Sequence, residues 1–169
     1  MLKLRPYEAD DAKEIVKWPE NEFVFRQWSA DGYPRYPAAP EDMNALYSKM
    51  AETVKLYPFT AIDEEGTIVG HLIMRYTDEK NGIIRFGFVI VDNGKRNCGL
   101  GKEMLKAALA HAFGTLKVSK VTLGVFENNP RAYACYTALG FKEVPLEIPD
   151  SCVLFGEKWI MKRLEINNK

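Results

Sequence analysis

The sequence predicts a mixed α/β fold in which helices flank one central sheet. Stretches with the apolar patterns of strands are interspersed with stretches of helical periodicity along the whole chain. Residues 81–91 are nearly continuously apolar after an Asn-Gly pair, which is typical of a central strand covered on both faces. Residues 129–140 begin with Asn-Pro and end with Gly, so both ends of a helix are marked.

Composition indicates one globular domain covering residues 1–169, with 47% hydrophobic and 27% charged residues. The 23 basic and 23 acidic residues balance, which argues against nucleic acid as a partner. No apolar run has transmembrane length and the first residues lack a signal-peptide core, so we expect no membrane partner and a cytoplasmic location. The three cysteines, Cys98, Cys135 and Cys152, lack metal-ligand spacing, so we expect reduced thiols and no metal.

The N-terminal part predicts a short strand at 2–7 and a helix at 8–18. Residues 18–40 mix aromatic residues with four prolines, too irregular for one long element and too aromatic for a linker. A helical stripe follows Pro40 and continues to Tyr57. Residues 59–78 then predict two strands around a turn at 64–66.

The C-terminal part begins with the strand that ends at residue 91. We expect a helix from about Gly99 to Gly114, a strand at 120–126 and a helix at 129–140. Two final strands follow, near 141–148 and 152–164.

The loop between residues 91 and 105 has the composition of a phosphate site, because glycines and cations precede a helix. A P-loop is excluded, since Leu100 and Gly101 occupy the positions of its Lys and Ser/Thr. A dinucleotide fingerprint is excluded, since Met104 occupies its third glycine position. Residues 96–101 do satisfy R/Q-x-x-G-x-G/A, in which successive amides can point into one concavity. By itself this short pattern could also be an ordinary strand-to-helix turn.

A second block supports the phosphate interpretation. Residues 125–141 follow V-x-x-x-N-x-x-A-x-x-x-Y-x-x-x-G-F, with every specified residue in register: Val125, Asn129, Ala132, Tyr136, Gly140 and Phe141. With both blocks and the order of elements, the chain resembles the GCN5-related N-acetyltransferase (GNAT) family. The resemblance implies a mixed, mostly antiparallel sheet that is splayed between two parallel strands and flanked by helices.

The resemblance also implies acetyl-CoA as donor, bound without a metal. Backbone groups of residues 89–91 would hold its pantetheine arm, and amides of residues 96–102 would hold its pyrophosphate. Asn129 and Ala132 would contact the cofactor, and Tyr136 would donate a proton or hydrogen bond to the departing sulfur. The residues implied as cofactor-binding are Val89, Ile90, Val91, Arg96, Asn97, Cys98, Gly99, Leu100, Gly101, Lys102, Asn129, Ala132 and Tyr136.

The base that accepts the amine proton stays open at this stage. Some members of the family carry a glutamate where this chain has Arg85, so Glu127 and Glu22 are the candidate bases. We expect His71 to be a packed residue rather than a base. The aromatic residues of segment 18–40 either line an acceptor pocket or cover the sheet, and no acidic cluster there indicates a polyamine site.

The function predicted is N-acetyl transfer to a primary amine, either a small molecule or a peptide N-terminus. A non-catalytic acyl-CoA sensor and a nucleotide-binding enzyme are the alternatives. A homodimer is possible.

Overall fold

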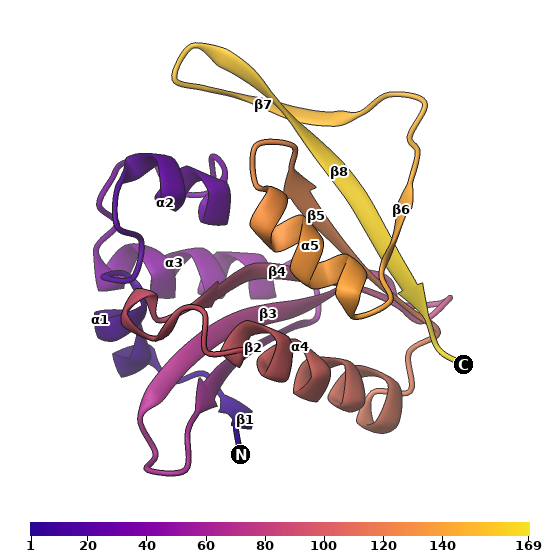
Figure 1. Ribbon diagram of the computed structural model, residues 1–169, viewed down its shortest axis with the longest axis horizontal. Helices are drawn as coiled ribbons and strands as arrows, with labels where there is room; N and C mark the ends of the chain where they lie inside the picture. The colour runs from indigo at the N-terminus through magenta and orange to yellow at the C-terminus, as the bar shows by residue number, and fades with distance from the viewer.

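A computed structural model describes residues 1–169, in which eight strands form one sheet in the order β1-β2-β3-β4-β5-β8-β6, with β7 paired to β8 (Figure 1). The strands are β1 (Lys3–Pro6), β2 (Leu56–Ile62), β3 (Ile68–Asp78), β4 (Ile83–Val91), β5 (Lys120–Phe126), β6 (Lys142–Val144), β7 (Asp150–Leu154) and β8 (Glu157–Asn167). The helices are α1 (Ala12–Ile15), α2 (Glu22–Ser29), α3 (Pro40–Ala51), α4 (Leu100–Ala110) and α5 (Pro130–Ala138).

The parallel pair β4–β5 is the exception in an otherwise antiparallel sheet, and it is short. Only Ile83, Ile84 and Arg85 of β4 pair with β5, opposite Lys120, Val121 and Thr122. Beyond Arg85 the two strands diverge, as their arrows show in Figure 1. The splayed, mostly antiparallel sheet predicted from the family resemblance is therefore confirmed.

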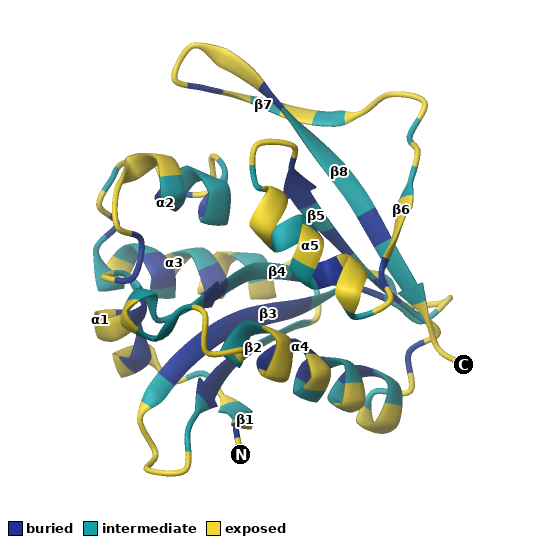
Figure 2. Cartoon of the chain, viewed as in Figure 1, coloured by how far each residue is buried: buried dark blue, intermediate teal, exposed yellow.

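Two helical layers cover the sheet. Helices α4 and α5 pack on one face, where Met104, Leu105 and Tyr136 join a core of 19 buried residues. Helices α1, α2 and α3 cover part of the other face around Ile73 and Ile90. Figure 2 shows exposed and buried residues alternating along α4, as expected for an amphipathic helix with one face on the sheet.

A β-bulge interrupts β4 at the edge of the gap. His71 pairs with Ile90 and Ile73 pairs with Gly87, so β4 has one more residue than β3 in this interval. Phe88 takes up the extra residue with a φ of 48°, a conformation that is uncommon for an aromatic residue. Its ring contacts the rings of Trp28, Tyr33 and Tyr47 from the helical layer. The bulge therefore ties α2 and α3 to the strand that borders the gap.

Several predicted elements differ from the structure. Segment 18–40 contains a regular helix, α2, whose start is capped by Asn21 through a hydrogen bond from the Val24 amide. The helix after Pro40 ends at Ala51, and Tyr57 belongs to β2. In both cases tertiary packing overrides a local signal. The helix predicted from about Gly99 to Gly114 is confirmed, since α4 begins at Leu100 and continues into a π-helical turn, His111–Thr115.

The last predicted strand, 152–164, is in fact a hairpin. β7 and β8 are joined at Phe155 and Gly156, whose φ values are 54° and 72°. Two consecutive residues with positive φ make the tight turn that suits the twist of a hairpin. Gly156 was the only local signal for this turn, since no Asn or Asp accompanies it.

None of the five helices combines the length and the hydropathy that a membrane crossing requires.

His71 is fully buried on β3, and its Nε2 atom lies 2.7 Å from the hydroxyl of Tyr47. The prediction of a packed histidine is thus confirmed. Burial lowers the pKa of His71 from its ordinary value of 6.5 to about 3, because a buried imidazolium would lose its hydration.

We expect His71 to make the fold acid-sensitive. Below pH 6.5 the unfolded chain binds a proton on His71 that the folded chain does not, so stability falls by about 1.4 kcal/mol per pH unit from this residue. His71→Gln removes the titration and should lose about 2 kcal/mol less than the wild type between pH 7 and pH 5. Urea denaturation at both pH values measures the difference. Equal losses in the two proteins would contradict the assignment.

Candidate active site

A cavity of about 630 Å³ lies where β4 and β5 part. Five elements and the loops between them line it. Its walls are Val24, Gln27 and Trp28 of α2; Phe86, Gly87, Phe88, Val89, Ile90 and Val91 of β4; Lys95, Arg96, Asn97, Gly99, Leu100, Gly101, Lys102 and Leu105 of the loop and α4; and Leu123, Gly124, Val125, Asn128, Asn129, Pro130, Arg131, Ala132, Cys135 and Tyr136 around β5 and α5.

The loop at the mouth of the cavity has the backbone of an anion site. Asn97 and Gly99 both have positive φ, 67° and 75°, and α4 begins at the next residue, Leu100. Such alternation turns successive N–H groups to one side, and the first amides of α4 have no partner within the helix. The glycine at 99 is needed for its conformation, since a Cβ there meets no atom within 4 Å.

The charge on the cavity wall is one-sided. Four cationic residues line it, Lys95, Arg96, Lys102 and Arg131, and no Asp or Glu does. Arg96 is in an ion pair with Glu20 at 3.3 Å and Lys95 with Asp63 at 3.0 Å, both outside the lining. Arg131 donates to the Asn97 side chain at 2.9 Å, which braces the loop against α5. The cavity therefore attracts anions.

The edge of β4 beyond Arg85 is open to the cavity. On one side this part of the strand pairs with β3, and on the other side β5 has moved away. Backbone groups on that edge are free to bind an extended ligand as an added strand would. Val89, Ile90 and Val91 all lie on this stretch.

Tyr136 projects into the cavity from α5. Its side chain is buried, and its hydroxyl forms no hydrogen bond within the chain. Burial raises the pKa of Tyr136 well above its ordinary value of 10, so the phenol stays protonated. Asn129 positions the helix by accepting a hydrogen bond from the Ala132 amide at 3.2 Å. The site thus holds a hydrogen-bond donor that is free to bind a ligand in the cavity.

The structure brings together twelve of the thirteen residues implied as cofactor-binding. The exception is Cys98, which is exposed in the loop and does not line the cavity. The two candidate bases also lie outside. Glu127 is exposed at the end of β5, and Glu22 faces a separate cavity of about 330 Å³ with Arg26 and Asp31. No carboxylate is therefore placed to take a proton inside the cavity.

Several lining residues were not foreseen from the sequence. Val24 and Gln27 come from α2, which was not predicted, and Gly87 and Gly124 stand where the strands part. Of the aromatic residues in segment 18–40, Trp28 lines the large cavity, whereas Trp18, Phe25 and Tyr33 are buried in the core. Asn21, as a helix cap before an amphipathic stretch, was the available signal for α2.

Comparison with known families gives one decisive match. The acetyltransferase (GNAT) domain matches residues 1–142, which is most of the chain and includes both the phosphate-type loop and Tyr136. The chain belongs to the GNAT family.

Curated relatives of this GNAT domain include polyamine acetyltransferases. Spermine/spermidine N(1)-acetyltransferase of Bacillus subtilis (strain 168) is 36% identical over 83 residues, which are 46% of this chain and 55% of the relative. The chain thus spans about half the length of that relative. Spermidine N(1)-acetyltransferase of Vibrio cholerae is 22% identical over 142 residues, covering 84% of this chain and 79% of the relative.

Solved structures share the fold. The crystal structure of Vibrio cholerae spermidine N-acetyltransferase in complex with CoA and spermine has a TM-score of 0.82 at 22% identity, covering 98% of this chain and 95% of that one. The dodecameric structure of spermidine N-acetyltransferase from the same organism, in an intermediate state, has a TM-score of 0.73 at 20% identity, covering 98% and 93%.

The two loop glycines should respond in opposite ways to alanine. Gly99→Ala places a side chain at positive φ and should lower the free energy of unfolding by about 1 kcal/mol. Gly101 is in the first turn of α4, and a Cβ there would meet only Val91 Cγ1, at 3.8 Å. Gly101→Ala should therefore be neutral or stabilise by up to about 1 kcal/mol. Denaturant unfolding tests both, and a loss of similar size at both positions would refute the assignment.

Proposed function

We propose that this GNAT domain is an acetyl-CoA-dependent N-acetyltransferase that transfers the acetyl group to a primary amine. The carrying observation is the cavity between the parted strands, which joins an anion-binding loop to a buried phenol with no partner. The family match and the CoA complex of a structural neighbour support the same donor.

Acetyl-CoA would lie along β4. Its pyrophosphate would be bound by the amides of residues 96–102 at the start of α4, where the helix dipole favours negative charge. Its pantetheine arm would pair with the free edge of β4 at residues 89–91. Lys95, Lys102 and Arg131 contribute positive charge without an opposing carboxylate on the wall.

The reaction is a direct displacement within a complex of both substrates. The neutral amine nitrogen attacks the thioester carbon, the C–N bond forms, and the C–S bond breaks as CoA leaves with the electron pair. Tyr136 donates a hydrogen bond that strengthens as the sulfur becomes negative. Its raised pKa favours this hydrogen bond over complete proton transfer, since a thiol has a pKa of about 8.5.

The amine proton leaves through water. Glu127 and Glu22 are outside the cavity, and the lining contains no carboxylate or histidine.

Tyr136→Phe should reduce kcat roughly 10- to 100-fold, because it removes a hydrogen bond to a charged leaving group. The dissociation constant of CoA should change little. Thiol release from acetyl-CoA with a panel of amines measures kcat, and calorimetry measures CoA binding.

Tyr133→Phe is the matched control on the same helix. The Tyr133 hydroxyl donates to Glu143 at 2.9 Å on the surface, outside the cavity, so its loss should leave kcat unchanged. Unchanged turnover in Tyr136→Phe would remove Tyr136 from the mechanism. CoA binding without amine-dependent thiol release would indicate an acyl-CoA sensor, and tighter binding of NAD or ATP would indicate a nucleotide-binding enzyme.

We also propose, from the same fold, self-association and a cytoplasmic location. A Vibrio cholerae relative is described as dodecameric. Here the β7–β8 hairpin exposes 70% of Val153 and 54% of Phe155, whose ring stacks on Phe23 of α2. We expect a mass above 19.2 kDa by light scattering and a smaller one for Phe155→Ser; a monomer in both would refute the association.

A further inference from the structure

Three arginines share one face of the sheet, opposite α4 and α5. Arg75 on β3 and Arg85 on β4 are direct cross-strand partners. Arg85 pairs with Thr122 of β5, and Arg163 on β8 pairs with Gly124, which is two residues after Thr122 on the same strand. Cross-strand partners and residues two apart direct their side chains to the same face. The three guanidinium groups therefore gather on that face.

Arg85 lies next to the closed end of the cavity but is not one of its lining residues. It is the last residue of β4 that pairs with β5, and the cavity begins at the next residue, Phe86. A Cβ on Gly124, which lines the cavity, would lie 2.5 Å from Nη2 of Arg85 and would also meet Met161. The Arg85 side chain thus occupies the space that a residue larger than glycine at 124 would need.

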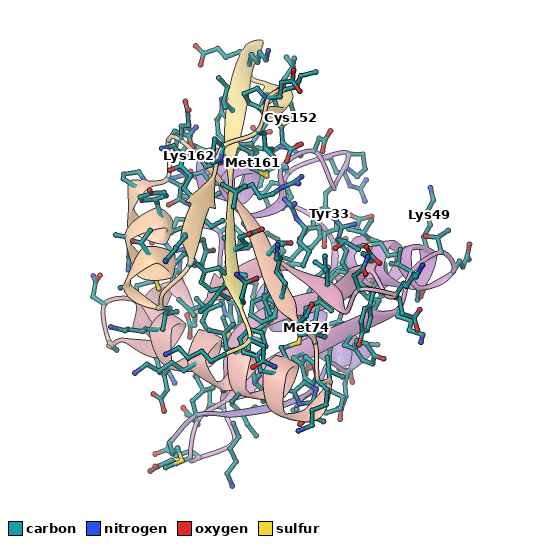
Figure 3. The ribbon with its side chains drawn as sticks, turned by 90° about the vertical axis from the view of Figure 1, so that its right-hand side faces the viewer. Tyr33, Lys49, Met74, Cys152, Met161 and Lys162 are labelled. Carbon is teal, nitrogen blue, oxygen red and sulfur yellow. The ribbon has the colours of Figure 1, made fainter.

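The Met161 side chain lies on the same face of the sheet as the three arginines. In Figure 3 it is labelled beside Lys162 on β8, and successive side chains leave a strand on opposite faces. Lys162 turns to the α5 side, where it lies over the ring of Tyr133. Met161 turns to the arginine side, where its Sδ atom is 3.3 Å from Arg85 Nη2.

Positive charge exceeds negative charge on this face. By the same alternation Lys120 and Glu165 also lie on it, and they form an ion pair with each other at 3.1 Å. Arg163 has an acidic partner, Asp150, at 3.1 Å, but its Nε atom is buried without a partner. The Arg85 side chain donates a hydrogen bond to the Met161 sulfur alone, and the Arg75 side chain forms no hydrogen bond or ion pair. Burial, with Arg75 and Arg163 nearby, lowers the pKa of Arg85. A half-buried guanidinium without a counter-charge is costly unless a ligand supplies one.

We propose that the acceptor amine carries an anionic group, a carboxylate or a phosphate, which Arg85 and Arg75 bind at the closed end of the cavity. This inference rests on the proposed acetyl transfer and names its substrate class. A polyamine would bring several positive charges next to the arginines of this face, and no carboxylate lines the cavity to pair with them. Polyamines are the substrates named for the relatives, so the proposed substrate class differs from theirs.

Acceptors matched in length test the proposal. Thiol release from acetyl-CoA is measured with 4-aminobutyrate, butylamine and 1,4-diaminobutane, which share a four-carbon skeleton and end in a carboxylate, a methyl group and an ammonium group. Shorter and longer ω-amino acids, O-phosphoethanolamine against ethanolamine, and spermidine complete the panel. We expect the best carboxylate or phosphate acceptor to exceed its uncharged match at least tenfold in kcat/KM, and the diamine and spermidine to be poorest. The ratio of kcat/KM between the carboxylate acceptor and the phosphate acceptor shows which of the two groups the site binds better.

Variants of the arginines test the residues. Arg85→Met and Arg75→Met should each lower kcat/KM roughly 10- to 100-fold for the anionic acceptor and leave the methyl-ended amine unchanged. Lys17→Met is the matched control, since it removes one charge at a side chain that is 64% exposed and paired with Glu14. Arg85→Met should also raise the melting temperature, because it removes an unbalanced charge. A purely structural arginine would instead lower the melting temperature and affect all acceptors alike.

Three outcomes separate the hypotheses. Spermidine or diaminobutane as best acceptor overturns the inference and leaves the acetyltransferase assignment standing. An anionic preference that persists in the Arg75→Met, Arg85→Met double variant overturns the role of these arginines. Thiol release with none of the amines overturns the proposed function, and the inference with it.

Discussion

The separation of β4 from β5 after the Arg85–Thr122 pair is the constraint on which the rest of the structure depends. It interrupts the hydrogen-bond ladder of the sheet at one place and leaves the edge of β4 free. It also opens a cavity that is lined by residues from the helices on both faces of the sheet. Each core supports one wall: α4 and α5 hold the phosphate-type loop and Tyr136 on one side, and α2 reaches the gap on the other. The bulge at Phe88 connects β4 to the second of these walls. It interrupts the regular pairing with β3, and the Phe88 ring contacts side chains of α2 and α3.

Charge in this molecule is distributed unevenly although the formal net charge is zero. Most ion pairs are on the surface, where they add little to stability. Around the gap the balance is different, since the lining has cations and no carboxylate, and Arg75 and Arg85 are unpaired beside it. Anionic ligands on both sides of the gap would account for this distribution. Such an arrangement lowers the stability of the empty protein in exchange for binding, as functional sites often do.

Local signals sufficed where the chain marks its own boundaries. The strand at 120–126 and the helix after Asn129 were predicted at the positions observed. The helix is delimited by Asn129, Pro130 and Gly140, and the strand is marked by its alternating apolar residues. Elements without such marks were misjudged. Prolines and aromatic residues around α2 obscured a helix that its buried face stabilises, and the hairpin at Phe155–Gly156 lacks the Asn-Gly or Asp-Gly pair that makes such turns visible. The stripe ending at Tyr57 failed because apolar residues of a helix and of the next strand can continue the same spacing.

The sequence by itself determined the family, the phosphate-type loop and the register of Tyr136, because these depend on residues adjacent in the chain whose backbone conformations are set locally. Only the tertiary structure decided which side chains share the cavity. It excluded Cys98, Glu22 and Glu127 from the lining, and it joined Arg75, Arg85 and Arg163 from three strands on one face. Those groups are far apart in sequence, and their proximity follows from strand order and pairing register, which no local pattern encodes.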